Sequence, residues 1–321
     1  MTGAVISTAL QALLLIPAAR LATRAKCSPC DIASEHSEWC GKVTALAFML
    51  YFIYESFLDI GDLAYFTDYF FSVNMPRLMT ALCVALAAVC AARTDIAVIG
   101  RTARIAFAGV VLMLIIIALG AAEDMDITRF DLAVEDLPAA VGKAVHAESS
   151  RCECLVLFCF LADDVDGDPE KTARRFILAK GVVITLILGM TTAVLGSYGE
   201  LGKLPVFSLA AASENLITER SDAVFLVIWV ITGLVKLTNL IHCAARCFRF
   251  IRPETTELGS ALACGLLPAF AALPLLLGYG WEKIIYSEHP LTPIIVLALV
   301  LPSFLLWYKP TTAASAAESE G

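Results

Sequence analysis

A lysine in the middle of an apolar run is the first residue of this chain that could do chemistry. Lys236 lies within residues 223–247 (AVFLVIWVITGLVKLTNLIHCAARC). If the run spans a bilayer, an ammonium group near its midplane costs about 2.5–3.5 kcal/mol on insertion scales. A carboxylate, a ring of carbonyl groups or a watery cavity must offset that cost. Lys236 therefore either forms a fixed ion pair that orients helices or lines a functional site, and we favour the site.

Polar residues recur around Lys236 at helical spacing. Asp222, Trp229 and Lys236 are seven residues apart, and Thr232 and Asn239 fall on the same side. A polar stripe on a spanning helix should face the interior of the bundle or a cavity rather than lipid. We therefore predict that these five side chains point inward.

Acidic residues follow one face of a second apolar segment, residues 43–65. Tyr51, Glu55, Asp59 and Asp62 are spaced by four, four and three. Three carboxylates on one face repel each other, so at least one should be paired or titrate unusually. Glu55 lies near mid-span and is a plausible counter-ion for Lys236. Asp59 and Asp62 approach the external end, where we expect Asp62 to meet water.

A short apolar segment, residues 152–162 (CECLVLFCFLA), contains a further acid, Glu153. The segment is too short to cross a bilayer as a full helix. It is either an interfacial or re-entrant piece or, as we favour, half of a discontinuous helix of the kind that transporters use to expose backbone dipoles to a ligand. Glu153 could then bind an amine or a cation, or it could cap the half-helix.

Three thiols and an imidazole form a further cluster near the N-terminus. Cys27, Cys30, His36 and Cys40 have a spacing that can close a tetrahedral zinc site. Reduced thiols in a cytoplasmic loop are the alternative that we favour, so we predict neither a metal nor a cofactor. The sequence contains no phosphate-binding loop, no nucleophile elbow and no basic aromatic surface. We therefore predict that the chain is not an enzyme and binds no nucleic acid.

The elements that must position these residues are membrane spans. Hydrophobic residues make up 59% of the 321 residues, and the mean hydropathy is +0.78. We predict an all-α integral membrane protein with a polytopic transmembrane domain over residues 1–308 and a disordered cytoplasmic tail over 309–321. The expected spans are 3–20, 43–65, 77–93, 103–122, 152–162, 176–196, 222–247, 258–278 and 291–308.

Basic residues alternate between the loops and predict the orientation. The loops after the first, third, fifth and seventh spans are the more basic ones, which places them in the cytoplasm. This alternation holds only if 152–162 counts as a crossing. Residues 122–150 then form an external loop with a short surface helix. Nine crossings with a cytoplasmic C-terminus place Met1 outside, which suggests that one preceding helix is missing.

These segments resemble the spore-germination permeases, which are the B subunits of nutrient germinant receptors in the amino acid–polyamine–organocation superfamily. Residues 219–248 resemble the family's eighth helix, in which an acid, a Trp and a Lys match Asp222, Trp229 and Lys236. Residues 151–164 (RCECLVLFCFLADD) resemble its broken sixth helix. Glu153 matches the family's acid there, whereas Cys152 replaces a Gly. Residues 41–57 and 79–107 resemble helices three to five.

The resemblance implies an inverted-repeat, five-plus-five transporter fold with nine of its ten core helices, where residues 3–20 correspond to the second helix. It implies a receptor subunit that binds a small nutrient, with an amino acid expected, and triggers germination with A and C partner subunits. The spore inner membrane or the cell membrane is the expected location. The alternatives are a proton-coupled amino-acid permease and a truncated relative without ligand binding.

The ligand is expected at the broken helix, opposite Tyr54 and Glu55. In this interpretation Lys236 supplies a fixed internal charge, and binding shifts a two-state helix bundle. The expected ligand-binding residues are Cys152, Glu153, Cys154, Phe158, Tyr54 and Glu55.

Overall fold

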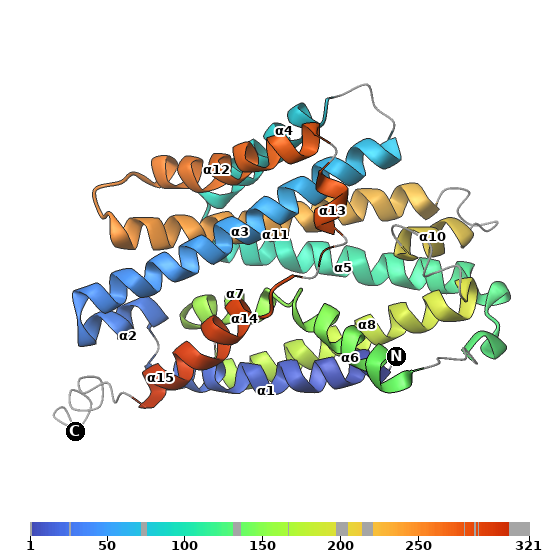
Figure 1. Ribbon diagram of the computed structural model, residues 1–321, viewed down its shortest axis with the longest axis horizontal. Coiled ribbons are helices and arrows are strands. Elements are labelled where there is room, and N and C mark those ends of the chain that lie inside the picture. Colours follow the sequence, from blue (N-terminus) through green and yellow to red (C-terminus); the bar gives the residue numbers. More distant parts are fainter. Residues whose placement is uncertain are drawn as a thin grey trace.

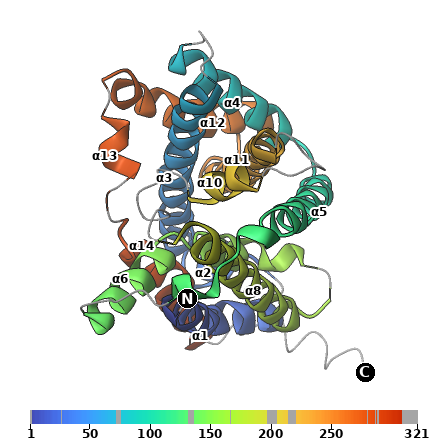
Figure 2. The same ribbon diagram turned by 90° about the vertical axis from the view of Figure 1, so that its right-hand side faces the viewer.

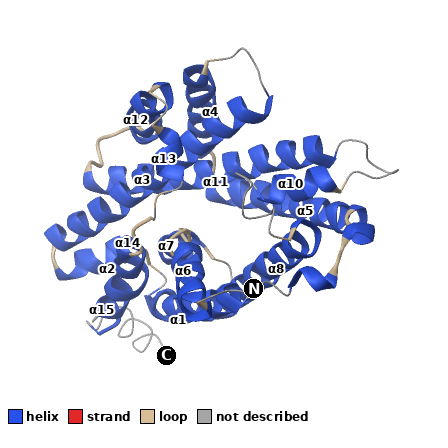
Figure 3. Cartoon of the chain, turned by 45° about the vertical axis from the view of Figure 1, so that its right-hand side comes forward, coloured by secondary structure: helices blue, strands red, loops and turns tan. Residues whose placement is uncertain are grey.

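The computed structural model describes residues 2–25, 27–71, 76–130, 136–165, 167–196, 205–213, 221–278, 280–285, 287 and 289–307. The predicted tail, 309–321, lies outside these residues. Within the described part of the chain every regular element is a helix and no strand occurs (Figure 3). The prediction of an all-α protein is confirmed.

Long helices dominate the chain and run along its longest dimension (Figure 1). Their bounds are α1 Thr2–Ala25, α3 Glu38–Phe71, α4 Arg77–Ala92, α5 Ile96–Gly120, α8 Pro169–Leu195, α11 Ser221–Ile251 and α12 Glu257–Leu277. The shorter helices are α2 Pro29–His36, α6 Leu137–Ser149, α7 Cys154–Leu161, α10 Pro205–Ala212, α13 Trp281–Ile285, α14 Thr292–Ile295 and α15 Leu301–Trp307.

Six helices are long and apolar enough to span a bilayer, namely α1, α3, α5, α8, α11 and α12, and they indicate a membrane protein. Residues 77–92 and 292–307 are apolar but shorter. These eight segments coincide with eight of the nine predicted spans. The ninth, 152–162, is helical only over α7, which is too short to cross alone.

Polar caps set where several helices begin. Asp168 accepts hydrogen bonds from the backbone N–H groups of Glu170 and Lys171 at the start of α8, and Pro169 follows it. Thr256 accepts from Gly259 N at the start of α12. Such caps satisfy amide groups that have no partner within the helix. These caps fix the residue at which each helix begins, and hence the position of its side chains along the helix axis.

The long helices form two groups. In the four-helix group, α3, α4, α11 and α12 all pack against one another. In the α1 group, α6, α7 and α8 all pack on α1. Figure 2 shows the two groups on opposite sides of the bundle, with α5 lying beside α11. The segment α14–α15 runs along α1 and contains a π-helical turn, Val296–Val300, in which Leu301 N bonds to Val296 O.

Apolar side chains on the outside of the bundle suit a lipid environment. On α5, Ile105, Leu112 and Leu119 recur every seven residues and are 75%, 58% and 66% exposed. The opposite side of the same helix buries Met113 and Ile117. In water such an exposed stripe would be a liability, whereas hydrocarbon solvates it.

An aromatic cluster joins the two groups. The ring of Phe160 on α7 lies 5.3 Å from the ring of Phe48 and 5.4 Å from that of Phe52, both on α3. All three side chains are fully buried. This contact anchors α7 against α3. It thereby sets the position of the non-helical turn that precedes α7.

Candidate functional site

Lys236 lies at the centre of the candidate site. It is fifteen residues from either end of α11, Ser221–Ile251. Its Nζ atom is 2.8 Å from Oδ1 of Asp59 on α3 and 3.1 Å from Oε1 of Glu153. Two carboxylates, one on α3 and one just before α7, thus offset the cost of placing the ammonium group at mid-span. The side chain of Lys236 is 34% exposed, so the ion pairs are not sealed off.

Glu153 lies in the interruption between α6 and α7, as the discontinuous-helix interpretation predicts. Ser150–Glu153 separate the two helices. The Glu153 side chain makes no capping hydrogen bond to α7, although the residue stands at the cap position. Its carboxylate turns instead to Lys236. Of the two roles predicted for Glu153, the cap is therefore wrong, and the carboxylate is available to a cation.

Asp59, not Glu55, is the residue on α3 that contacts Lys236. The prediction of Glu55 as the counter-ion is wrong in this respect, because Asp59 lies one turn further along the same helical face. Glu55 is nevertheless buried and interacts electrostatically with Glu153, Lys236 and Asp59. We call Glu55, Asp59 and Glu153 the carboxylate cluster. Among the described residues, Oδ2 of Asp59 has no hydrogen-bond partner.

Tyr51 takes the place that was expected for Tyr54. Tyr51 is buried beside Glu55 and close enough to interact with Glu153 and Cys154. Tyr54 lies on a more exposed side of α3, with its hydroxyl 3.5 Å from Nδ1 of His289. Burial lowers the pKa of His289, and the positive charges of Arg151 and Lys236 lower it further. Tyr54 therefore belongs to the rim of the cluster.

The other predicted ligand-binding residues belong to α7 and the turn before it. Cys152 is fully buried, and its Sγ lies 3.2 Å from Sγ of Cys154. Phe158 is half-buried and packs against the core that α3 and α7 share. These three side chains shape the start of α7, where Glu153 provides the charge.

Lys180 is a second lysine at the interruption, and the sequence reasoning missed it. Its Nζ lies 3.2 Å from Oε1 of Glu148 and 3.1 Å from Sγ of Cys152, so it contacts the end of α6 and the turn that follows. It also donates to Oε1 of Gln11 on α1 at 3.0 Å. The predicted span 176–196 made Lys180 look like a terminal residue. The Asp168-Pro169 cap signal would have placed the helix start earlier and Lys180 well inside the helix.

The polar stripe on α11 is only partly directed inward. Thr232 is exposed and donates to Ile228 O of its own helix, and Asn239 donates to Val235 O in the same way. Asp222 accepts from Ala223 N at the start of α11. Trp229 stacks edge-on against Phe66 of α3, 5.7 Å between ring centres. The prediction is correct for Lys236 and Trp229, but wrong for Thr232.

Asp62 meets an indole rather than open water. Its Oδ1 accepts a hydrogen bond of 3.1 Å from Nε1 of Trp281, which is fully buried at the start of α13. The ring of Trp281 occupies the space where a Cβ of residue 61 would stand, so Gly61 makes this contact possible. Asp62, which follows the carboxylate cluster along α3, is thus covered by the start of α13.

The cysteine cluster near the N-terminus does not assemble. Cys27, His36 and Cys40 are exposed, whereas Cys30 is buried in the core beside Cys247. Within the described ranges, no three His, Cys, Asp or Glu side chains are placed to hold a metal ion. The zinc alternative therefore has no geometric support.

The cluster has a surplus of acidic groups. Two carboxylates contact the ammonium group of Lys236 and that of Glu55 lies close to them, and Oδ2 of Asp59 has no hydrogen-bond partner among the described residues. Such a site favours an added cation, an amine or a proton. Neither the comparison with models of known protein families nor the comparison with curated proteins finds a match for this chain. The resemblance to the spore-germination permeases therefore stays a prediction that rests on the residues quoted above.

Proposed function

We propose that this chain is the membrane subunit of a spore germinant receptor and that it binds a small amino acid at the interruption between α6 and α7. The observation that carries the proposal is the excess of carboxylates around Lys236 at mid-span. Intramembrane ionisable groups are costly, and they mark ligand or ion sites by default. An amino group offers the positive charge and the N–H donors that this cluster lacks.

The ligand amine would bind on the side of the cluster away from Lys236. Lys236 already occupies Oδ1 of Asp59 and Oε1 of Glu153. Oδ2 of Asp59 and the carboxylate of Glu55 provide the remaining acceptors. Lys236 then acts as a fixed charge that holds the acids in place, as the resemblance implies, and the nutrient makes its own contacts to them.

The packing of the helices supports an inverted-repeat architecture. With α6 and α7 counted as one span, α8 is the fifth span after α1, α11 the fifth after α3, and α12 the fifth after α4. Each of these helices packs against its counterpart. In inverted-repeat transporters the substrate site lies at mid-membrane beside interrupted helices. The carboxylate cluster lies beside the interruption between α6 and α7 and at the midpoint of α11, which supports such a site.

A proton-coupled amino-acid permease is the second candidate. Its specific support is Glu55, a carboxyl group only 8% exposed and flanked by Asp59 and Glu153. Carboxyl groups inside a membrane protein can carry protons as well as bind amines. A site that exchanges a proton for an amine would couple the two fluxes.

Signalling to partner subunits would use the same contacts. An amine bound at the remaining acceptors shares the carboxylate cluster with Lys236, and it thereby changes the strength of the tie between α11 and the α6–α7 interruption. Binding would thereby shift the population between two arrangements of the helix groups. The A and C subunits, which we propose as partners in the spore inner membrane or cell membrane, would respond to that shift.

Binding and uptake of radiolabelled amino acids by the purified chain test the proposal. Saturable binding in detergent without accumulation in proteoliposomes supports the receptor. Concentrative uptake driven by an imposed proton gradient supports the permease instead. If none of the common amino acids binds, and Asp59→Asn behaves like the unmodified chain, the proposed ligand site is wrong.

A further inference from the structure

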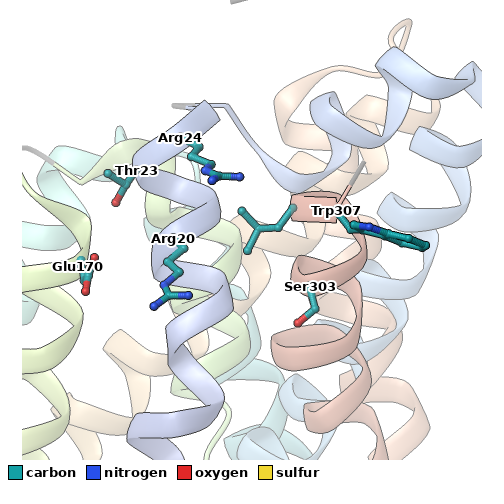
Figure 4. Close-up of a pocket in the computed structure, with 7 residues that line it drawn as sticks. Arg20, Thr23, Arg24, Glu170, Ser303 and Trp307 are labelled. Atoms are coloured by element: carbon teal, nitrogen blue, oxygen red, sulfur yellow. The ribbon is translucent and has the colours of Figure 1, made fainter. Parts of the chain in front are cut away.

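A pocket with two arginines in its lining opens at the end of the bundle where α1 and α15 finish, well away from the carboxylate cluster. Its volume is about 530 Å3. It is lined by Arg20, Thr23, Arg24, Glu170, Ser303, Leu306 and Trp307. We call it the α1–α15 pocket. Figure 4 shows Arg20 and Arg24 on α1 and Ser303 and Trp307 on the neighbouring α15.

The two arginines are the chemical centre of this pocket. Arg20 and Arg24 are one helical turn apart, and both are exposed. The only acidic side chain in the lining is Glu170, which projects from α8 on the other side of α1 (Figure 4). Arginine presents several N–H donors in a planar fork that matches the oxygens of a phosphate group. The hydroxyl of Ser303 adds a further possible donor on the facing helix.

The pocket lies at the level where lipid headgroups are expected. Trp307 is 86% exposed, and Trp39 at the start of α3 is 76% exposed. Trp307 is the last residue of α15, and Trp39 lies beside the same helix, since it lines a neighbouring apolar pocket together with Phe304 and Leu305. Exposed tryptophans gather at the boundary between hydrocarbon and headgroups. The alternation of basic loops assigns this end to the cytoplasmic side, where anionic lipids are found.

We propose that the α1–α15 pocket binds the phosphate of an anionic phospholipid from the cytoplasmic leaflet. Arg20 and Arg24 would hold the phosphate oxygens, and Trp307 would pack beside the headgroup. The acyl chains would remain in the bilayer along α15. This site is independent of the function proposed above, because it shares no residue with the carboxylate cluster.

The test is a titration of the purified full-length chain in a mild non-ionic detergent with short-chain phosphatidylglycerol, followed by native mass spectrometry. We expect saturable binding that weakens about tenfold or more in Arg20→Gln/Arg24→Gln. Glu170→Gln should bind at least as tightly as the unmodified chain, because it removes a repulsive charge. The melting temperature of each variant without lipid verifies that the fold is retained.

A matched control has the same change of charge at the same end of the bundle. Arg101 and Arg104 are exposed near the start of α5 and do not line the pocket. The variant Arg101→Gln/Arg104→Gln should bind phosphatidylglycerol like the unmodified chain. An equal loss in both double variants would mean non-specific attraction to a basic surface and would overturn the site.

Two further ligands decide the chemistry. Short-chain phosphatidylcholine, whose headgroup has no net charge, should bind much more weakly. Inorganic phosphate should compete poorly, because it lacks the glycerol and acyl parts that would pack beside Trp307 and α15. Equal binding of phosphatidylcholine would refute the anionic preference, and full competition by inorganic phosphate at matched concentration would refute a lipid as the source.

Discussion

The Nζ atom of Lys236 lies 3.1 Å from Oε1 of Glu153, so the midpoint of α11 is joined to the interruption between α6 and α7. The same atom lies 2.8 Å from Oδ1 of Asp59 on α3. One side chain thus connects the four-helix group with the α1 group at mid-span. Substitutions at these residues can separate what the contacts do for stability from what they do for a ligand.

Lys236→Met should destabilise the protein and abolish ligand binding. Removing one partner of a buried ion pair leaves the others uncompensated, which costs several kcal/mol. Because about a third of the Lys236 side chain is exposed, we expect about 2–3 kcal/mol, measured as the free energy of unfolding in detergent. Lys236→Met/Asp59→Asn should recover part of that stability without recovering binding. Lys42→Met serves as the control, because its partner Glu38 is at the surface. Binding that survives in Lys236→Met would leave this lysine a structural role alone.

Glu153→Gln should weaken amino-acid binding by about tenfold or more, because the carboxylate cluster that attracts the ligand amine loses one negative charge. The amide keeps the shape of the side chain and can still accept from Lys236. Equilibrium binding of the radiolabelled ligand measures the change. An affinity that stays the same while the melting temperature falls would make Glu153 a structural tie and not part of the ligand site.

Lys180→Gln should make the turn between α6 and α7 less ordered, because it removes the lysine that contacts this turn from α8. Lys180 contacts Glu148 and Cys152, which flank the turn between α6 and α7. Without the ammonium group we expect faster amide hydrogen exchange in a peptide that covers residues 146–156. Arg174→Gln, an exposed change on the same helix, is the matched control. Equal exchange in the two variants would contradict a role for Lys180 in ordering this turn.

Gly61→Ala should be strongly destabilising because a Cβ there overlaps the buried indole of Trp281. Overpacking of this kind costs about 1–3 kcal/mol. Gly100→Ala on α5 is the control, since nothing lies within 4 Å of its added Cβ. There the better helix propensity of alanine should raise stability slightly. Thermal unfolding followed by tryptophan fluorescence measures both, and similar midpoints for the two variants would contradict the close approach.

His289 should give the folded state a dependence on pH. Its pKa is lowered in the folded chain, first by burial and then by Arg151 and Lys236. As the pH falls below about 6.5, the unfolded chain therefore takes up the proton first and stability declines. For one proton the slope cannot exceed about 1.4 kcal/mol per pH unit. His289→Gln should remove this part of the slope in unfolding measurements between about pH 7.5 and 5.5. Identical slopes would show that His289 does not titrate differently in the two states.

The sequence predicted the helices far better than their contacts. Eight of the nine segments predicted from hydropathy are helical, and six of these helices are long and apolar enough to span a bilayer. Periodicity also placed Glu55 and Asp59 correctly on one face of α3. It could not choose between them, because residues four apart share a face and differ only in height along the helix. Whether Lys236 contacts Glu55 or Asp59 depends on where it lies along the axis of α3. That position follows from the packing between α11 and α3.

Two other errors have physical reasons of the same kind. Thr232 fits the polar stripe by spacing, but a threonine can satisfy its hydroxyl on the backbone of its own helix and then tolerate an outward position. Lys180 was overlooked because the expected span began at residue 176, whereas α8 begins at Pro169. Because α8 begins before the apolar run, its midpoint lies closer to the N-terminus than the midpoint of the predicted span. Cap residues are therefore a better guide than hydropathy to which charges lie at mid-helix.

The turn Ser150–Glu153 has a lysine on each side of it, and each lysine comes from a different group of helices. Apolar faces can slide past one another at little cost, whereas an ion pair in a poorly solvated place resists being pulled apart. If one helix group rotates against the other, this turn should therefore act as the hinge. A molecule that binds beside the hinge needs to cause only a small displacement there, because the rotation produces a much larger displacement at the far ends of the helices.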